Sequence, residues 1–322
     1  ITFFYSNQQS ARLMFYHDHS YGITRLNVYA GEAAGYLIED PTEKQLIADG
    51  IVPADQIPLI IQDRTFVDAD TTLVTDPTWN WGSMPGMAMT GDLWFPHVYM
   101  PNQNPYDLGG ANPFGRWDYG PWFWPPWPVT YGEVNNPYYD PINAPWEPPM
   151  VPGVPNVSMT MEAFHDTPLV NGTAYPYIEV QPKTYRFRIL NAANDRFWNL
   201  LLLQADPAVS VGTAGLTEVK MVPFYPGTWP AGWGTPDARE GGVPDPCMLG
   251  PDIIQIGNEG GFLPAPVVWS NIPVDYEYDR RNIVVLNVKE HNLFLGCAER
   301  ADVIIDFSAF RGVLNFVNGS RI

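Results

Sequence analysis

Short apolar runs separated by glycine, proline and polar turns dominate the hydrophobic pattern of the chain. Between Arg12 and Asp40 these runs are brief and mixed with glycine and small residues, and a further run covers Ile57 to Phe66. Short runs bounded by turn residues predict strands of a sheet. Between Asp40-Pro41 and Pro53, the residues Glu, Lys, Gln, Leu and Ala follow a proline, which predicts one short helical surface connector.

The second half of the chain returns to strand signals. From Thr167 onward β-branched and aromatic residues alternate, and the break at Asn171-Gly172 predicts a hairpin followed by a long strand. Many short strands without long helices predict a sandwich or Greek-key barrel rather than a parallel α/β sheet. Later strands, separated by Gly and Pro turns, are predicted over residues 252–256, 282–288, 301–307 and 313–317.

Residues 76–155 interrupt this pattern with a stretch rich in Pro, Trp, Tyr, Gly and Asn that has no helical or strand periodicity. Such length without regular structure is unusual inside a compact domain. Because the aromatic rings can bury against a neighbouring surface, we interpret the stretch as an ordered, packed insertion or linker.

Composition and charge narrow the class of protein. At 322 residues the chain is long enough for two domains with cores of their own. Lys and Arg number 17 against 35 Asp and Glu, and the resulting formal charge of -18 argues against binding to nucleic acid or an anionic membrane. No apolar run approaches the roughly 20 residues of a transmembrane helix, so no membrane span is expected.

The two cysteines, Cys247 and Cys297, constrain the chain little. They are too few for a disulfide framework and lack the CxxC spacing of a zinc site. A single bridge between them and two unpaired thiols are both compatible with the sequence, because nothing in it fixes their separation in space.

His17-Asp18-His19 is the sharpest chemical feature of the sequence. In an extended strand, residues i and i+2 project from the same face, so two imidazoles at this spacing can reach one metal ion or two adjacent ones. An HxH pair also arises by chance from two ordinary histidines, so the pair alone does not establish metal binding.

The residues around this pair read FYHDHSYGITRLNVYAGEAAGYLIEDP. This segment resembles the second HxH segment of the first cupredoxin domain in three-domain multicopper oxidases of the bacterial spore-coat laccase type. The resemblance implies that His17 and His19 each ligate one copper of the coupled type 3 pair. Imidazole suits this role because it is a neutral, borderline ligand that accepts both Cu(I) and Cu(II).

Three later segments resemble the non-ligating middle cupredoxin domain of the same family: DTPLVNGTAYPYIEVQPKTYRFRILNAANDRF, IIQIGNEGGFLPAPV and LFLGCAERADVIIDFS. The insertion resembles the enlarged linkers of large, surface-exposed bacterial members, some of them linked to metal oxidation. We therefore predict an all-β chain of cupredoxin-like Greek-key β-sandwich domains with a long Pro- and aromatic-rich irregular insertion. The predicted parts are the C-terminal part of cupredoxin domain 1 (1–75), the insertion (76–155) and cupredoxin domain 2 without copper ligands (156–322).

The resemblance also implies parts that this sequence lacks. The family needs an upstream HxH pair and a third domain with HxxHxH and HCHxxxH segments, and none of these occurs in the sequence. Types 1 and 2 copper therefore need ligands absent from this chain. Residue 1 is Ile and the sequence opens inside a predicted strand, so we expect the N-terminal part of domain 1 to be missing.

The leading interpretation is a fragment of a laccase-like or metal-oxidising multicopper oxidase, inactive in isolation. The complete enzyme would couple one-electron oxidation of a phenolic or metal-ion donor to the four-electron reduction of dioxygen to water. The implied partners are dioxygen, the donor, the missing part of domain 1 and a third cupredoxin domain. The family also implies an extracellular, cell-surface or periplasmic location.

Two other interpretations remain. A structural or assembly protein could retain the cupredoxin scaffold without catalysis and use the aromatic insertion as an interface. A mononuclear zinc or copper protein could use the HxH pair alone, although two ligands without a third normally hold a metal loosely.

Met84, Met87 and Met89 form a cluster of thioethers that could bind Cu(I) on a flexible loop. Filling gaps beneath the aromatic insertion is the commoner use of methionine, and we favour that interpretation.

The remaining histidines, His97, His165 and His291, are interpreted as ordinary hydrogen-bonded histidines and are left out of the site. Several acidic residues could attract a cation such as Mn(II) but are equally well explained as solvated carboxylates, so no ion site is predicted there: Asp68, Asp70, Glu133, Asp140 and Glu147.

Overall fold

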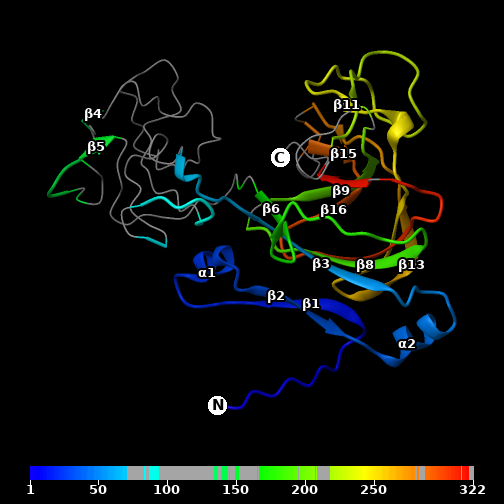
Figure 1. Ribbon diagram of the computed structural model, residues 1–322, viewed down its shortest axis with the longest axis horizontal. Coiled ribbons are helices and arrows are strands. Elements are labelled where there is room, and N and C mark those ends of the chain that lie inside the picture. Colours follow the sequence, from blue (N-terminus) through cyan, green and yellow to red (C-terminus); the bar gives the residue numbers. More distant parts are fainter. Residues whose placement is uncertain are drawn as a thin grey trace. The chain divides into compact units, whose positions relative to one another are not determined.

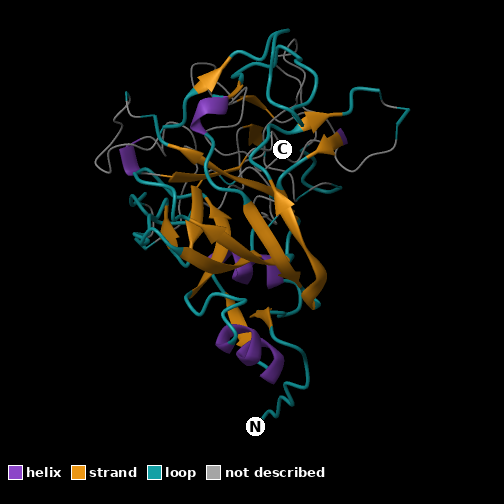
Figure 2. Ribbon diagram, turned by 90° about the vertical axis from the view of Figure 1, so that its right-hand side faces the viewer, coloured by secondary structure: helices purple, strands orange, loops and turns teal. Residues whose placement is uncertain are grey.

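Strands dominate the computed structural model, and its helices are short (Figure 2). This confirms the predicted all-β class. None of the helices in the described part of the chain is long and apolar enough to cross a membrane. The structure describes residues 1–70, 83–84, 87–93, 134–135, 139–143, 145, 149–151, 165, 167–194, 196–206, 208, 218–279, 281–282, 287–312 and 314–318.

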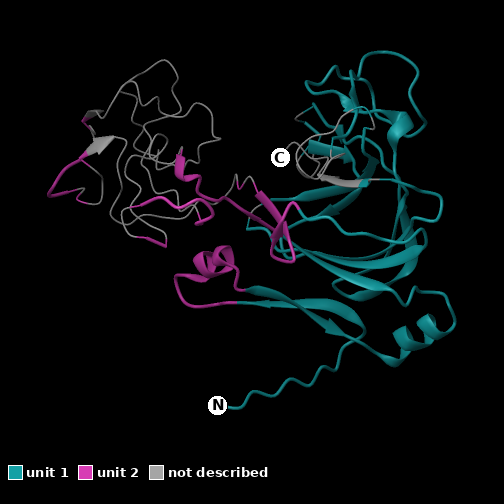
Figure 3. Ribbon diagram, in the orientation of Figure 1, with its two compact units in different colours: residues 1–17, 33–61, 176–322 teal, residues 18–32, 62–175 magenta. Residues whose placement is uncertain are grey.

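Two compact units divide the chain (Figure 3). Unit 1 comprises residues 1–17, 33–61 and 176–322, and unit 2 comprises residues 18–32 and 62–175. The domain boundaries expected from the sequence stay a prediction, and most of the expected insertion lies outside the described residues.

Unit 1 is built on two sheets (Figure 1). One has the strand order β13-β12-β17-β8-β3, in which β3 and β8 are parallel and the other neighbours are antiparallel. The other has the antiparallel order β16-β9-β18. The chain passes from the first sheet to the second between β8 and β9 and again between β17 and β18, as a Greek-key sandwich requires. The bounds are β3 Gln56–Arg64, β8 Thr184–Asn191, β9 Trp198–Gln204, β12 Ile253–Asn258, β13 Gly261–Trp269, β16 Leu293–Leu295, β17 Arg300–Asp306 and β18 Leu314–Asn318.

Short paired elements complete unit 1. Three antiparallel pairs are β1 with β2, β10 with β11, and β14 with β15. Their bounds, with those of the helices of unit 1, are β1 Arg12–His17, β2 Ala33–Ile38, α2 Pro41–Ala48, β10 Met221–Val222, β11 Val243–Pro244, η2 Pro246–Met248, β14 Asp275–Tyr276 and β15 Val288–Glu290.

The core of unit 1 draws apolar side chains from both sheets. Leu200 to Leu203 on β9 are each at most 4% exposed, and Ile189 on β8 and Val303 on β17 are fully buried. An unbroken run of four leucines suits β9 because the strand is buried on both faces. Each such side chain contributes roughly 1.5–3 kcal/mol of hydrophobic stabilisation.

The two-stranded ribbon β1–β2 has one buried and one open face. Leu13 packs with Leu190 and Ala192 of β8 and the residue after it, and Phe15 packs against the same cluster. Successive side chains of a strand point to opposite faces, so Tyr16 lies on the face opposite to Leu13 and Phe15. Tyr16 is 63% exposed, and β1 and β2 form a sheet of their own among the described residues. The apolar contacts of the ribbon with unit 1 therefore lie on the face of Leu13 and Phe15, and a hydrogen bond from Arg12 to the Glu259 carbonyl at 3.0 Å adds to them.

Helix α2, which follows β2, begins as the sequence predicts. Asp40 is its N-cap, and its carboxylate accepts the backbone N–H of Glu43 at 2.7 Å, while Pro41 occupies the first turn. The other carboxylate oxygen of Asp40 accepts the N–H of Ala11 at 2.9 Å, which ties the start of β1 to the start of α2.

A buried group of four charged side chains anchors α2 to the first sheet. Glu43, 1% exposed, accepts hydrogen bonds from Arg186 Nη1 at 2.6 Å and from Arg188 Nη2, and both arginines lie on β8. Asp302 on β17 accepts two further bonds from Arg186. Burial lowers the pKa of Arg188, and the charge of Asp302 opposes that shift. Two positive and two negative side chains therefore neutralise one another inside unit 1.

Among the described residues of unit 2, the elements with complete bounds are the helix α1 and two short strand pairs. The hairpin of β6 and β7 turns through Asn171 at φ 50° and Gly172 at φ 82°, the positive values that a type I′ turn requires. The hairpin expected at Asn171-Gly172 is therefore confirmed. The bounds are α1 Thr24–Ala30, β4 Val134–Asn135, β5 Met150–Val151, β6 Thr167–Val170 and β7 Thr173–Ala174.

Three expectations differ from the structure. The sequence is expected to open inside a strand, but residues 1–11 carry none and β1 begins at Arg12. Residues 24–30 carry strand-like alternation, but they form the helix α1, which ends at Gly31 with φ 122°. The helix is fixed from outside by the Tyr29 hydroxyl, which donates to the Thr65 carbonyl at 3.0 Å, so a tertiary contact overrides the local pattern. Of the strand expected over 282–288, residues 283–286 lie outside the described residues, and β15 begins at Val288.

We predict that Glu43→Gln lowers the free energy of unfolding by about 3–5 kcal/mol, because two buried guanidinium groups lose their shared carboxylate. Urea denaturation followed by circular dichroism measures the change. The matched control is Glu39→Gln, which breaks an exposed 3.3 Å pair with Lys44 and keeps both hydrogen bonds of Glu43, so it should cost less than about 1 kcal/mol. Equal denaturation midpoints for the two variants would contradict the anchoring role of Glu43.

Candidate metal centre

His17 is the last residue of β1 and is exposed to solvent. Its strand partner is Ala33, and its ring stacks on Phe15 with 5.7 Å between ring centroids and 22° between planes. Phe15 in turn packs on the buried cluster of unit 1 and lies beneath the guanidinium of Arg300 at 5.4 Å. The His17 imidazole therefore stacks on Phe15, a side chain that the core of unit 1 holds in place.

His19 lies just beyond the strand and is also exposed. The β1–β2 ladder extends one residue past His17, because the N–H of Asp18 donates to the Glu32 carbonyl at 3.0 Å, and His19 then enters the turn before α1. The alternation of side chains along a strand therefore does not by itself determine where the His19 imidazole points. The convergence of both imidazoles on a copper pair stays a prediction.

Asp18, between the two histidines, organises this turn. Its carboxylate accepts the backbone N–H of Ser20 at 2.9 Å, the Ser20 hydroxyl at 2.6 Å and the side-chain amide of Asn27 at 2.9 Å. The backbone on either side of His19 is thereby fixed to helix α1. Sequence reasoning missed this role, although Asp-x-Ser is a pattern that forms such side-chain-to-backbone turns.

Beside α1, unit 2 contains a buried polar cluster that includes the third described histidine. His165 is 2% exposed, its Nδ1 lies 3.4 Å from Asp63 Oδ1, and its ring stacks on Tyr29 at 4.8 Å. Arg64 Nε donates to the Tyr29 carbonyl at 2.7 Å. The interpretation of His165 as an ordinary hydrogen-bonded histidine stays a prediction.

The other histidines do not join the pair in the described part of the structure. His291 is partly buried, with Nδ1 2.7 Å from the Asn292 carbonyl oxygen and its ring near Trp269 at 5.3 Å. His97 lies outside the described residues. Among the histidines that the structure describes, His17 and His19 are thus the two that are exposed.

Cys247 and Cys297 are exposed, and the possible disulfide between them does not form. Within the described ranges, no group of three or more His, Cys, Asp or Glu side chains is placed to hold a metal ion. The donor set fits copper only in part: two accessible imidazoles suit the metal, and any complete coordination sphere needs ligands from elsewhere.

Comparison with known proteins gives matches along almost the whole chain, although no family model matches. The chain is 28% identical over 310 residues to a laccase from Bacillus subtilis, a match that covers 96% of this chain and 33% of the relative. It is 29% identical over 309 residues to a laccase from Bacillus stratosphericus, covering 95% of this chain and 34% of the relative.

The chain is thus similar to laccases, which are multicopper oxidases. This similarity supports an oxidoreductase family, and a multicopper oxidase family implies copper as the cofactor. Among solved structures, the multicopper oxidase McoA from Aquifex aeolicus matches with a TM-score of 0.44 and 21% identity, covering 94% of this chain and 35% of that one. The chain spans about a third of the length of the curated laccases it matches.

We predict that Asp18→Ala loosens the turn around His19, because three hydrogen bonds to one carboxylate disappear at once. Amide hydrogen exchange in residues 19–30, followed by mass spectrometry, should become at least about tenfold faster, which corresponds to about 1.4 kcal/mol. Asp49→Ala is the matched control, since its carboxylate accepts a single surface bond from Gln45 at 2.8 Å and should leave this segment unchanged. Unaltered exchange in Asp18→Ala would show that the carboxylate does not hold the turn.

Proposed function

We propose that His17 and His19 each ligate one copper of a type 3 pair, in a multicopper oxidase that reduces dioxygen to water with electrons from a phenolic or metal-ion donor. The observation that carries the proposal is the pair of exposed imidazoles at the end of β1, within a chain that matches laccases over 96% of its length. Copper in such an enzyme supplies the one-electron steps that link the donor to dioxygen.

In this proposal, residues of this chain bind the copper ions and orient the two imidazoles that ligate them. Phe15 stacks on the His17 ring and limits its rotation. The carboxylate of Asp18 fixes the backbone on both sides of His19 through Ser20 and Asn27. Partners that orient a metal-binding imidazole typically change metal affinity or activity by about 10- to 100-fold when removed.

Further segments of polypeptide would complete the copper sites. Two ligands normally hold copper loosely, and the chain spans about a third of its laccase relatives. The open face of the β1–β2 ribbon supports this proposal, because Tyr16 and Tyr36 are 63% and 41% exposed on it. We propose that the remainder of the first cupredoxin domain covers this face and that a third cupredoxin domain brings the other ligands, in a protein exported to the periplasm or the cell exterior.

The test uses the polypeptide encoded by the gene together with the sequence that flanks this chain. His17→Ala and His19→Ala should each lower copper content and reduce dioxygen consumption with a phenolic donor by at least about 100-fold, more than the loss of an orienting partner would. An oxygen electrode and metal analysis provide the measurements.

His291→Ala is the matched control, because this histidine packs against Trp269 and should leave the copper content unchanged. Full copper occupancy in both His17→Ala and His19→Ala would overturn the assignment. A flanking sequence without further copper ligands would favour the alternative, a structural protein that retains the cupredoxin scaffold.

A further inference from the structure

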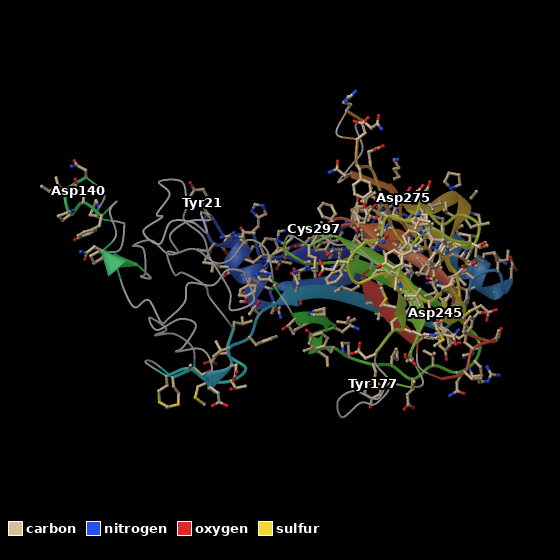
Figure 4. All side chains as sticks on the ribbon, turned by 90° about the horizontal axis from the view of Figure 1, so that it is seen from above. Tyr21, Asp140, Tyr177, Asp245, Asp275 and Cys297 are labelled. Atoms are coloured by element: carbon tan, nitrogen blue, oxygen red, sulfur yellow. The ribbon has the colours of Figure 1, made fainter. Side chains whose placement is uncertain are left out.

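Three methionines of unit 2 are exposed to solvent within a span of six residues. Met84, Met87 and Met89 are 48%, 52% and 38% exposed. Methionine is among the residues most often buried, so three exposed thioethers in one short segment are unusual. Their packing beneath the aromatic insertion stays a prediction, because most of that insertion lies outside the described residues. Figure 4 shows yellow sulfur atoms on the cyan segment that carries these residues.

The backbone of this segment brings the first two methionines together. The N–H of Met87 donates to the Met84 carbonyl at 3.1 Å, and the two residues form an antiparallel bridge. Residues paired across such a bridge project to the same side, with Cβ atoms about 4.5–5.5 Å apart. Met89 follows Met87 by two residues, and its carbonyl opens the turn that Asp92 closes.

Asp92 closes the segment and limits its motion. Its carboxylate accepts the backbone N–H of Ser83 at 3.1 Å and also the Ser83 hydroxyl, and its N–H donates to the Met89 carbonyl at 3.1 Å. The Asp92 carbonyl accepts the N–H of Val67 at 2.7 Å. The residues on both sides of the methionines are thus fixed, which reduces the entropy lost when three flexible side chains converge on a ligand.

We propose that Met84, Met87 and Met89 bind one Cu(I) ion through their three thioether sulfurs. Thioethers are soft, neutral ligands that select Cu(I) over harder cations such as Mg²⁺, Ca²⁺ and Mn²⁺. They do not titrate in the physiological range, so this site keeps its affinity at mildly acidic pH, where imidazole ligands become protonated. The proposal is independent of His17 and His19 and stands even if these bind no copper.

The test is an anaerobic titration of the whole chain with Cu(I) against the chromophoric chelator bicinchoninate. Because free thiols and imidazoles also bind Cu(I), the parent protein for the titration carries Cys247→Ser, Cys297→Ser, His17→Ala and His19→Ala. This parent should bind one equivalent of Cu(I), with similar affinity at pH 7 and pH 5.5. X-ray absorption at the copper edge should report sulfur neighbours.

Replacing all three methionines by leucine should weaken Cu(I) binding by at least about 100-fold, more than the loss of an orienting partner would, because leucine keeps the bulk and removes the ligand atom. Met221→Leu is the matched control, since Met221 is 48% exposed and lies in unit 1, and this variant should bind as the parent does. Circular dichroism verifies that each variant is folded.

Unchanged Cu(I) affinity in the folded triple variant, or a copper-edge spectrum without sulfur neighbours, would overturn the site. Neither result would bear on the copper pair proposed at His17 and His19, because both histidines are already absent from the parent. Conversely, loss of copper in His17→Ala with unaltered thioether binding would separate the two sites.

Discussion

One buried carboxylate, that of Glu43, fixes the path by which the chain leads to its first histidine. Glu43 is held by Arg186 and Arg188 in the first sheet, so α2 cannot leave the sheet without exposing or isolating buried charge. Strand β2 ends just before α2 and pairs with β1 along its length, and β1 ends at His17. The placement of a candidate copper ligand in unit 1 therefore depends on an ion network that has no chemical role of its own.

The sequence predicts those parts of the fold that local chemistry determines. Asn171-Gly172 favours the positive φ angles of a tight hairpin, and Asp40-Pro41 supplies both a cap and a fixed first turn for α2. Helix α1 could not be predicted in this way, because its residues alternate like a strand and its anchor, Thr65, lies far along the chain from Tyr29. The ion pairs between α2, β8 and β17 could not be predicted either, because their residues lie far apart in the sequence and meet only in the folded sheet.

The candidate metal site also has features that the sequence predicts and features that only the structure shows. The HxH spacing and its surrounding residues pointed to copper, and the relatives bear out the family. The role of Asp18 emerges only with Asn27 beside it, and the sequence shows the three methionines but not that their side chains are exposed. The residue types, histidine and methionine, suggested metal binding. The solvent exposure of each side chain then distinguished the ones available to a metal ion from the ones packed in the protein.

The exposed face of the β1–β2 ribbon has a practical consequence for handling this chain. In the described part of the chain no third strand pairs with β1 or β2, and two-stranded sheets with exposed tyrosines can be extended by strand addition from other chains. Dilute preparations and brief storage would suit such a molecule, and light scattering across a concentration series is the appropriate check before any spectroscopic titration is interpreted as that of a monomer.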